Sequence, residues 1–249
     1  MSDMTFAGQV ALVTGATRGI GAAIAHELAS KGLKVVGTAT SVDGAAKITQ
    51  ALSTYPGCAG RVLDVTDGAA LEALVDSVTR DYGGLHVLVN NAGITRDRMF
   101  LKMTREDWDA VIETNLNSMF NVTKQVVGDM VEKGWGRIVN ISSVNGEKGQ
   151  AGQTNYSAAK AGMHGFSMAL AQELATKGVT VNTVSPGYIG TDMVRAIRQD
   201  VLDKIVATIP VKRLGEPSEI ASIIAWLASE EGGYSTGADF SVNGGLHMG

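Results

Sequence analysis

Near its start the chain reads Gln9-Val-Ala-Leu-Val-Thr-Gly-Ala-Thr-Arg-Gly-Ile-Gly21, in which an apolar run passes directly into a glycine-rich turn. The apolar part, residues 9–14, is typical of a buried strand. The residues after the turn carry apolar side chains at helical spacing up to Gly32, which predicts a helix. A glycine-rich turn between a strand and a helix lets the backbone approach a phosphate at the helix N-terminus. The stretch therefore predicts the first unit of a nucleotide-binding α/β fold.

The same alternation of strand and helix continues to the end of the chain. The remaining strands are apolar along their whole length, which is typical of a parallel sheet covered on both faces. We therefore predict one α/β domain over residues 1–249, a Rossmann-like doubly wound parallel sheet of about seven strands with helices on both faces. Strands are expected at 33–38, 59–64, 85–89, 137–141, 179–184 and 238–242. Helices are expected at 43–53, after 67, and at 104–133, 156–177, 191–207 and 217–228.

Composition excludes several classes of function. The net charge is −4 and no basic tract is present, which disfavours nucleic acid as a partner. No apolar run is long enough to span a membrane, and the first seven residues lack the features of a signal peptide. Cys58 is the single cysteine, so no intramolecular disulfide can form. These features predict a cytoplasmic protein that binds neither nucleic acid nor membranes.

The histidines indicate no metal site. They stand at His26, His86, His164 and His247, without the spacing of metal ligands. We therefore expect them to pack or face solvent, and we expect no metal.

A second stretch, Asn140 to Lys160, carries the groups best suited to proton transfer. Tyr156 and Lys160 stand four residues apart on one predicted helix, so their side chains share a face. A neighbouring cation favours the phenolate, so we expect Lys160 to lower the pKa of Tyr156 from its usual value of about 10. The Ser143 hydroxyl is placed to hydrogen-bond the same substrate oxygen. Taken alone, a tyrosine and a lysine at this spacing are more typical of a polar helix surface than of a catalytic pair.

The end of the second predicted strand bears on the choice of nicotinamide cofactor. A carboxylate there would hold the ribose hydroxyls of NAD and repel a 2′-phosphate. The sequence instead reads Gly37-Thr-Ala-Thr40-Ser, with no carboxylate before Asp43, and Arg18 in the glycine-rich turn could reach the phosphate. NADPH is therefore favoured, with NADH use left open. Asp64, at the end of the third strand, is either an acceptor for the adenine amino group or a helix cap.

Several motifs in fixed order make the chain resemble the short-chain dehydrogenase/reductase family over nearly its whole length. They are the glycine-rich turn, Asn90-Asn-Ala-Gly93, Asn115, Ser143, Tyr156-x-x-x-Lys160 and Ser185-Pro-Gly187. From about Asn90 onward the chain is similar to the acetoacetyl-CoA reductases of polyhydroxybutyrate synthesis, in stretches such as Trp135-Gly-Arg-Ile-Val-Asn-Ile-Ser-Ser-Val-Asn-Gly146 and the terminal Asn243-Gly-Gly-Leu-His-Met-Gly249. The first third is more similar to the 3-oxoacyl-carrier-protein reductases of fatty-acid synthesis.

This resemblance implies a reaction and a set of site residues. The implied reaction reduces the 3-ketone of acetoacetyl-CoA to (R)-3-hydroxybutyryl-CoA by hydride transfer from the nicotinamide, with Tyr156 as general acid. The implied catalytic residues are Asn115, Ser143, Tyr156 and Lys160. The implied cofactor contacts are Gly15, Thr17, Arg18, Gly19, Ile20, Gly21, Thr40, Asp64, Val65, Asn91, Ala92, Gly93, Tyr156, Lys160, Pro186, Gly187, Ile189 and Thr191. The implied substrate contacts are Asp97, Lys102, Ser143, Gln150, Gln153, Tyr156 and Tyr188.

The resemblance further implies a substrate lid at about residues 189–207 and a homotetramer. Ala151 stands where the similar reductases carry a phenylalanine, which leaves the preferred acyl length open. Two alternatives remain. The first is a 3-oxoacyl-carrier-protein reductase of fatty-acid synthesis. The second is a regulator that senses nucleotides without catalysis, which is disfavoured because Tyr156 and Lys160 are both present.

Overall fold

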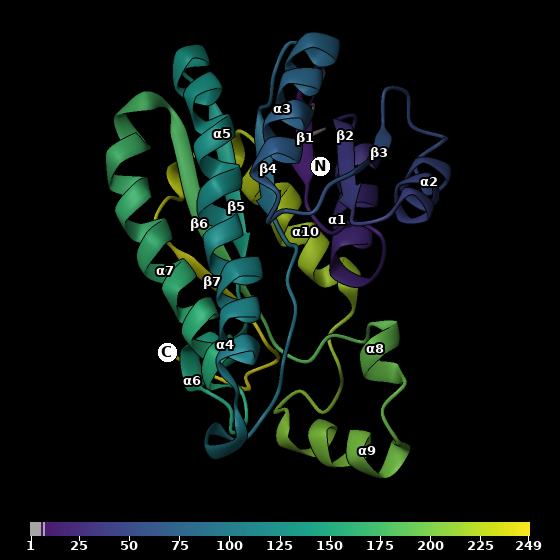
Figure 1. The fold of residues 1–249 in the computed structure, drawn as a ribbon, viewed down its shortest axis with the longest axis vertical. Coiled ribbons are helices and arrows are strands. Elements are labelled where there is room, and N and C mark those ends of the chain that lie inside the picture. Colours follow the sequence, from purple (N-terminus) through teal and green to yellow (C-terminus); the bar gives the residue numbers. More distant parts are fainter. Residues whose placement is uncertain (1–5, 7) are drawn as a thin grey trace.

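The computed structural model describes residue 6 and residues 8–249. Seven parallel strands form one sheet in the order β3-β2-β1-β4-β5-β6-β7 (Figure 1). The strand order reverses between β1 and β4, so the loops after these strands separate and leave a crevice at their carboxyl ends. The predicted Rossmann-like fold is confirmed. The strands are β1 (Val10–Val13), β2 (Lys34–Ala39), β3 (Ala59–Val62), β4 (Val87–Asn90), β5 (Gly136–Ile141), β6 (Val179–Pro186) and β7 (Asp239–Val242).

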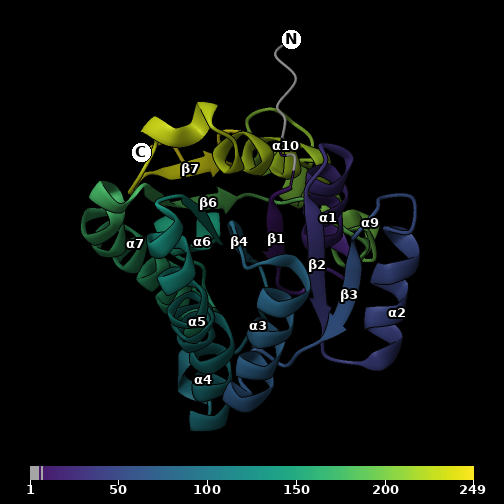
Figure 2. The ribbon, with the colours of Figure 1, turned by 90° about the horizontal axis from the view of Figure 1, so that it is seen from above.

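Helices cover both faces of the sheet, as Figure 2 shows from above. Apolar side chains of α1 (Gly19–Ser30), α2 (Val42–Ala51) and α10 (Pro217–Ala228) share one core cluster. Those of α3 (Gly68–Tyr82), α5 (Ser118–Lys133) and α7 (Thr154–Leu174) share the other.

Strand β1 illustrates why helices must pack on both faces of the sheet. Val10 and Leu12 pack into the cluster of α3 and α5, whereas Ala11 and Val13 pack into the cluster of α1 and α10. All four side chains are fully buried. A strand that is apolar at every position is stable only when both of its faces are covered, which is the pattern that predicted the parallel sheet.

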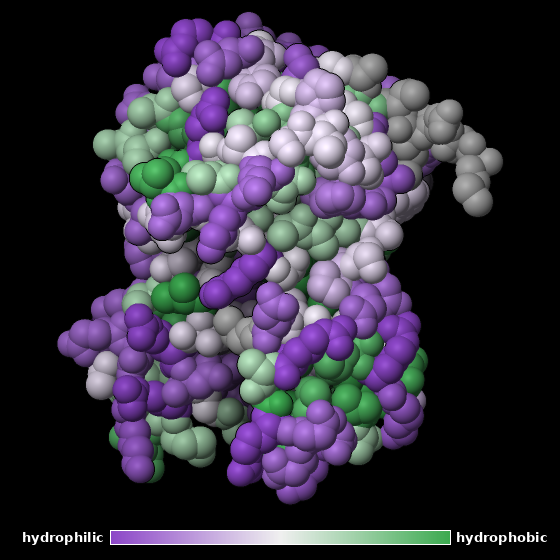
Figure 3. Space-filling view, turned by 90° about the vertical axis from the view of Figure 1, so that its right-hand side faces the viewer, coloured by the Kyte–Doolittle hydropathy of each residue, from purple (hydrophilic) through white to green (hydrophobic). Residues whose placement is uncertain are grey.

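The shorter helices lie at the carboxyl ends of the strands, at the bottom of Figure 1. They are α4 (Arg105–Ile112), α6 (Val144–Lys148), α8 (Asp192–Arg195) and α9 (Gln199–Thr208). Helices α8 and α9 occupy the stretch predicted as one helical lid. In the space-filling view of that side, the molecule narrows between its upper body and the lower part (Figure 3).

Two local predictions needed correction. The helix predicted over 104–133 begins with a capping box of Thr104 and Asp107, but a π-helical segment, Glu113–Asn117, separates α4 from α5. The predicted loop between Ser143 and Tyr156 contains helix α6. Among the described residues, no helix is long and apolar enough to cross a membrane.

Candidate active site

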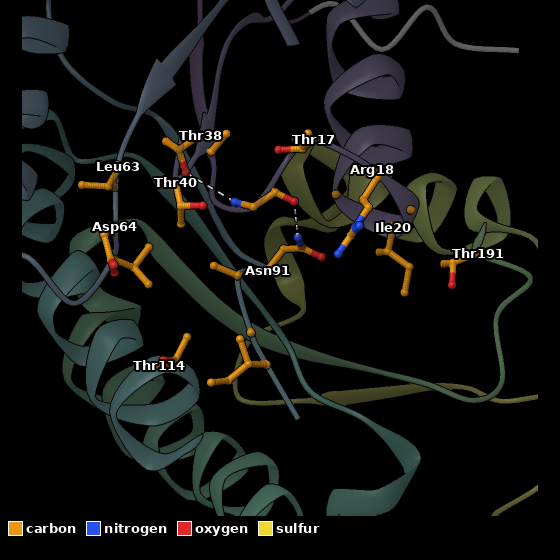
Figure 4. Close-up of a pocket in the computed structure, with 18 of the residues that line it drawn as sticks. Thr17, Arg18, Ile20, Thr38, Thr40, Leu63, Asp64, Asn91, Thr114 and Thr191 are labelled. Carbon is orange, nitrogen blue, oxygen red and sulfur yellow. Dashed lines mark hydrogen bonds between the residues drawn. The ribbon is translucent and has the colours of Figure 1, made fainter. Parts of the chain in front are cut away.

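A cavity of about 870 Å³ lies at the carboxyl ends of β1 to β4 (Figure 4). The turn after β1 forms one wall, the ends of β2 and β3 form another, and the start of α8 closes one side. Thirteen of the predicted cofactor contacts line this cavity, namely Gly15, Thr17, Arg18, Gly19, Ile20, Gly21, Thr40, Asp64, Val65, Asn91, Ala92, Gly93 and Thr191. Most of the predicted cofactor contacts therefore line one cavity.

The glycine-rich turn is shaped by close contact with the loop after β4. Gly15 has a φ of +67°, a conformation that glycine adopts freely. A Cβ atom on Gly21 would lie 2.3 Å from the Gly15 carbonyl oxygen. The Asn91 Nδ2 atom donates to the carbonyl oxygens of Thr14 (2.9 Å) and Gly15 (3.1 Å). The glycines are thus required by the packing of the two loops, which holds the turn open toward the cavity.

The N-terminus of α1 faces the same cavity and suits a phosphate. Arg18 is the N-cap residue and makes no side-chain capping bond, and the first turn of the helix carries no acidic residue. The exposed N–H groups of a first turn, together with the helix dipole, favour an anion. The Arg18 side chain extends into the cavity (Figure 4). Unsatisfied backbone donors and a guanidinium on one wall fit a pyrophosphate or a 2′-phosphate.

The far end of the cavity is polar and carries one carboxylate from the end of β3. Asp64 accepts hydrogen bonds from the Thr66 backbone N–H (3.0 Å) and hydroxyl (2.7 Å), and these bonds lower the pKa of its carboxyl group. Asp67, not Asp64, caps α3 by accepting from the Ala70 N–H at 3.0 Å. The helix-cap interpretation of Asp64 is therefore wrong, and its carboxylate faces the cavity.

Lys160 is buried beneath the catalytic candidates. Its side chain is 3% exposed, and its Nζ atom donates to the Ile141 carbonyl oxygen at 2.7 Å. Burial disfavours the charged ammonium and lowers the pKa of Lys160 to about 7. The Nζ atom lies 5.5 Å from the centre of the Tyr156 ring. Helix α7 therefore brings the two side chains together as predicted.

The expected effect of Lys160 on Tyr156 does not hold in the structure. Burial raises the pKa of the Tyr156 phenol, hydrogen bonding to Ser143 opposes the rise, and the charge of Asp97 adds to it. The prediction of a lowered pKa was wrong because the same burial that surrounds Tyr156 also removes much of the positive charge from Lys160. Tyr156 accordingly keeps its proton at neutral pH.

Asn115 lies inside the π-helical segment and is 1% exposed, so it is not a surface amide. Its Oδ1 atom accepts from the Ile94 N–H at 2.8 Å, and its Nδ2 atom donates to the Ile94 carbonyl oxygen at 2.9 Å. A Cβ atom on Gly93 would lie 3.1 Å from Asn115 Oδ1 and 3.7 Å from Lys160 Nζ. Asn115 thus holds the loop after β4 close to the lysine. π-Helical turns are frequent at functional sites.

A hydrogen-bonded chain joins two predicted substrate contacts to Ser143. The Gln153 Nε2 atom donates to Asp97 Oδ2 at 2.7 Å. Gln153 Oε1 accepts from Asn145 Nδ2 at 2.9 Å, and the Asn145 N–H donates to Ser143 Oγ at 3.2 Å. The Asn145 Oδ1 atom is buried and has no partner among the described residues. The loop after β4 and the loop after β5 therefore form one polar surface beside Tyr156.

The other predicted contacts take no part in this hydrogen-bonded chain or do not line the large cavity. Gln150 and Lys102 are exposed, Lys102 at the end of the short 3₁₀ helix Phe100–Lys102. Tyr188 lines a smaller cavity of about 110 Å³, together with Gly187 and Ile189. The predicted cofactor contacts that do not line the large cavity are Tyr156, Lys160, Pro186, Gly187 and Ile189.

Several site residues were missed from the sequence. Those that line the large cavity are Thr38, Ala39, Leu63, Thr66, Ile94, Thr114 and Asp192. Most of them adjoin a predicted strand end, which would have identified them. Ser142 was also missed, although its hydroxyl donates to the Lys160 carbonyl oxygen at 3.0 Å and contacts His164 Nε2 at 2.8 Å. In the described part of the chain, no cluster of three or more His, Cys, Asp or Glu residues could hold a metal ion.

Comparison with known proteins identifies the relatives of this chain. A family model described as enoyl-(acyl carrier protein) reductase matches residues 15–247. Acetoacetyl-CoA reductase of Cupriavidus necator is 64% identical over 243 residues, 97% of this chain and 99% of that protein. Nodulation protein G of Azospirillum brasilense is 54% identical over 241 residues, 96% of this chain and 98% of that protein.

A 3-oxoacyl-(acyl-carrier-protein) reductase of Escherichia coli is 51% identical over 247 residues, 98% of this chain and 100% of that protein. The similarity thus extends over the glycine-rich turn, the Tyr156 helix and the C-terminal strand alike. The chain belongs to the short-chain dehydrogenase/reductase family, whose reductases use a nicotinamide cofactor.

Proposed function

We propose that this protein is an NADPH-dependent acetoacetyl-CoA reductase that forms (R)-3-hydroxybutyryl-CoA. The observation that carries the proposal is the grouping of Ser143, Tyr156 and Lys160 beside a cavity fitted to a dinucleotide. The acetoacetyl-CoA reductase of Cupriavidus necator, 64% identical to this chain, supports the choice of substrate.

The proton donor of the reaction is Tyr156. When bound, the nicotinamide supplies the hydride that reduces the 3-ketone carbon. Negative charge then develops on the ketone oxygen, and the raised pKa of the Tyr156 phenol means that its proton is available there at neutral pH. Ser143 donates a second hydrogen bond to the same oxygen and stabilises the developing charge. The products are the 3-hydroxy thioester and the oxidised cofactor.

Lys160 and Asn115 restore the proton. A lysine whose pKa is about 7 can take up or release a proton near neutral pH. Its neighbour Asn115 keeps the loop after β4 next to Lys160 through the two bonds to Ile94. The π-helical segment around Asn115 changes the backbone hydrogen bonding at this point, which leaves backbone groups able to hold a water molecule between the lysine and solvent.

The cavity residues hold the cofactor. The turn Gly15 to Gly21 receives the pyrophosphate at the N-terminus of α1, and Asp64 accepts from the adenine amino group. Arg18 and Thr40 receive the 2′-phosphate, because Arg18 is the one cation among the described lining residues and no carboxylate ends β2. Lys160 also binds the nicotinamide ribose, and Pro186, Gly187 and Ile189 lie along the nicotinamide side.

The acyl-CoA thioester occupies the polar surface beside Tyr156. Asp97 and Gln153 contact the acyl part, with Gln150 and Tyr188 bordering it, and Lys102 pairs with a CoA phosphate. Residues 189–207, which contain α8, form the lid of a single domain that spans 1–249. Phe120 on α5 and Met168 on α7 are about half exposed (53% and 50%), which supports burial of these faces in a homotetramer.

The alternative substrate is a 3-oxoacyl thioester of acyl-carrier protein, which the 51% identity to the reductase of Escherichia coli supports. Initial rates distinguish the two functions. We expect kcat/KM on acetoacetyl-CoA with NADPH to exceed both the value with NADH and the value on acetoacetyl-carrier protein. A preference for the carrier-protein thioester would overturn the proposed substrate, and absence of turnover on both would favour a regulator.

A further inference from the structure

Asn155 is fully buried and directly precedes Tyr156. Its Nδ2 atom donates to the carbonyl oxygens of Arg96 (3.1 Å) and Asp107 (3.0 Å). Its Oδ1 atom accepts from the backbone N–H of Tyr156 at 2.8 Å. One amide group thus satisfies three backbone groups from three segments, with no contact to solvent.

Asn155 also replaces a missing helix cap. Gln153 is the N-cap residue of α7 and makes no side-chain capping bond, because its amide is directed to Asp97 and Asn145. The Tyr156 N–H is one of the first-turn donors that have no partner within the helix. Asn155 Oδ1 provides that partner and so fixes the backbone from which the Tyr156 phenol projects.

The segments that Asn155 joins carry the other side of the site. Arg96 adjoins Asp97, which contacts Gln153, and Asp107 belongs to the first turn of α4. Two further links between these segments involve Arg98. They are the exposed ion pair of Arg98 with Asp107 (2.7 Å) and the hydrogen bond from the Arg98 N–H to the Gly152 carbonyl oxygen (2.8 Å). Exposed pairs hold geometry weakly, so the buried amide is the firmest connection.

We propose that Asn155 is a positioning residue that fixes Tyr156 relative to the loop bearing Asp97, so that the proton donor and the substrate surface keep one geometry. The inference rests on the proposed function in treating Tyr156 as the proton donor. Asn155 itself touches neither substrate nor cofactor and acts through the backbone of its neighbours.

The test uses Asn155→Ala with Asn182→Ala as the matched control. Asn182 is also fully buried and bridges backbone groups, with Nδ2 donating to the Ser235 carbonyl oxygen (2.7 Å) and Oδ1 accepting from the Ala238 N–H (3.2 Å). We expect both variants to lower Tm. Only Asn155→Ala should also lower kcat, by roughly 10- to 100-fold, with a larger solvent deuterium isotope effect and an unchanged KM for NADPH. Equal kcat values in the two variants would overturn the proposal.

A titration keeps the test independent of the substrate. The chain has five tyrosines, and the phenolate absorbance of Tyr156 is obtained by subtracting the Tyr156→Phe titration. Asn155→Ala should shift the Tyr156 midpoint from that of the wild type, and Asn182→Ala should not. If the wild type fails to reduce acetoacetyl-CoA, the proposed function fails while this readout still decides the role of Asn155.

A second variant covers the possibility that Asn155→Ala does not fold. Asn155→Asp keeps the acceptor for the Tyr156 N–H, and its protonated form keeps one donor for the Arg96 or Asp107 carbonyl. Burial favours that protonated form at low pH. We expect kcat relative to the wild type to recover as pH falls from about 8 to 5.5. A ratio that stays constant over this range, or that stays at the wild-type value, would contradict the positioning role.

Discussion

The Lys160 Nζ atom lies 5.5 Å from the centre of the Tyr156 ring, and its hydrogen bond goes to the Ile141 carbonyl oxygen instead of the phenol. Burial shifts the pKa values of the two side chains in opposite directions. It raises the pKa of Tyr156 and lowers that of Lys160 to about 7. The phenol therefore retains its proton while the lysine exchanges one near neutral pH. This division suits a general acid that is recharged after each turnover.

Replacing the lysine should reveal its lowered pKa as a dependence of stability on pH. Above pH 7 the folded protein holds Lys160 mostly neutral, whereas the unfolded chain keeps it charged up to its ordinary value of 10.5. The unfolded state then binds more protons, so the wild type gains stability relative to Lys160→Met as pH rises, by up to ~1.4 kcal/mol per pH unit. Urea unfolding at pH 6, 7, 8 and 9 measures this difference. The difference in unfolding free energy between the two proteins should be constant below about pH 6. A difference that stays constant up to pH 9 would show that the pKa of Lys160 is not lowered.

The glycine turn should tolerate no side chain at Gly21. A Cβ atom there would lie 2.3 Å from the Gly15 carbonyl oxygen and 2.5 Å from Asn91 Nδ2, so Gly21→Ala must separate the two loops. We expect a lower Tm and a loss of NADPH affinity measured by calorimetry. Gly165→Ala is the control, because its Cβ meets no atom within 4 Å and alanine stabilises a helix by ~0.5–1 kcal/mol. Equal affinities in the two variants would contradict the packing argument.

Cofactor choice should follow Arg18 and Thr40. Arg18→Ala removes the guanidinium and should lower the affinity for NADPH about tenfold or more. The affinity for NADH should stay nearly unchanged, since only NADPH carries the 2′-phosphate. Thr40→Asp should act in the same direction through charge repulsion. Lys47→Ala removes the same charge from an exposed position on α2 outside the cavity and should change neither affinity. If Arg18→Ala lowered the affinity for NADPH and for NADH equally, Arg18 would not bind the 2′-phosphate.

The preference of the enzyme for acyl groups of a given length should depend on Ala151. This residue is exposed in the turn before Gln153, where a larger side chain would fill space beside the substrate surface. We expect Ala151→Phe to lower kcat/KM for a 3-oxooctanoyl thioester several-fold relative to acetoacetyl-CoA, because one wall of the acyl site moves inward. Initial rates on the two thioesters measure this ratio. If the ratio of the two kcat/KM values did not change, residue 151 would not border the acyl site.

Most of the fold was predictable because it depends on patterns that are local in the sequence. The strands are apolar on both faces, and Pro217 marks the start of α10 at the position where proline is tolerated. The π-helical segment Glu113–Asn117 was not predictable, since a shift in backbone bonding leaves the apolar pattern intact. Helix α6 was not predicted either, because its five residues are too few to show the helical repeat of apolar side chains.

The candidate site divides in the same way. The glycine turn and the pairing of Tyr156 with Lys160 follow from spacing within one element. The direction of the Tyr156 pKa shift depends on burial by the whole fold, which spacing does not encode. Asn155 bonds to residues 59 and 48 positions away, so its role appears only in three dimensions.

The most direct measurement is NADPH oxidation by Tyr156→Phe on acetoacetyl-CoA, compared with the wild type at saturating cofactor. Phenylalanine fills the same space and removes only the hydroxyl that donates the proton. We expect kcat to fall by roughly 10²- to 10⁴-fold, with a much smaller change in NADPH affinity. A variant that keeps the turnover of the wild type would contradict Tyr156 as the general acid.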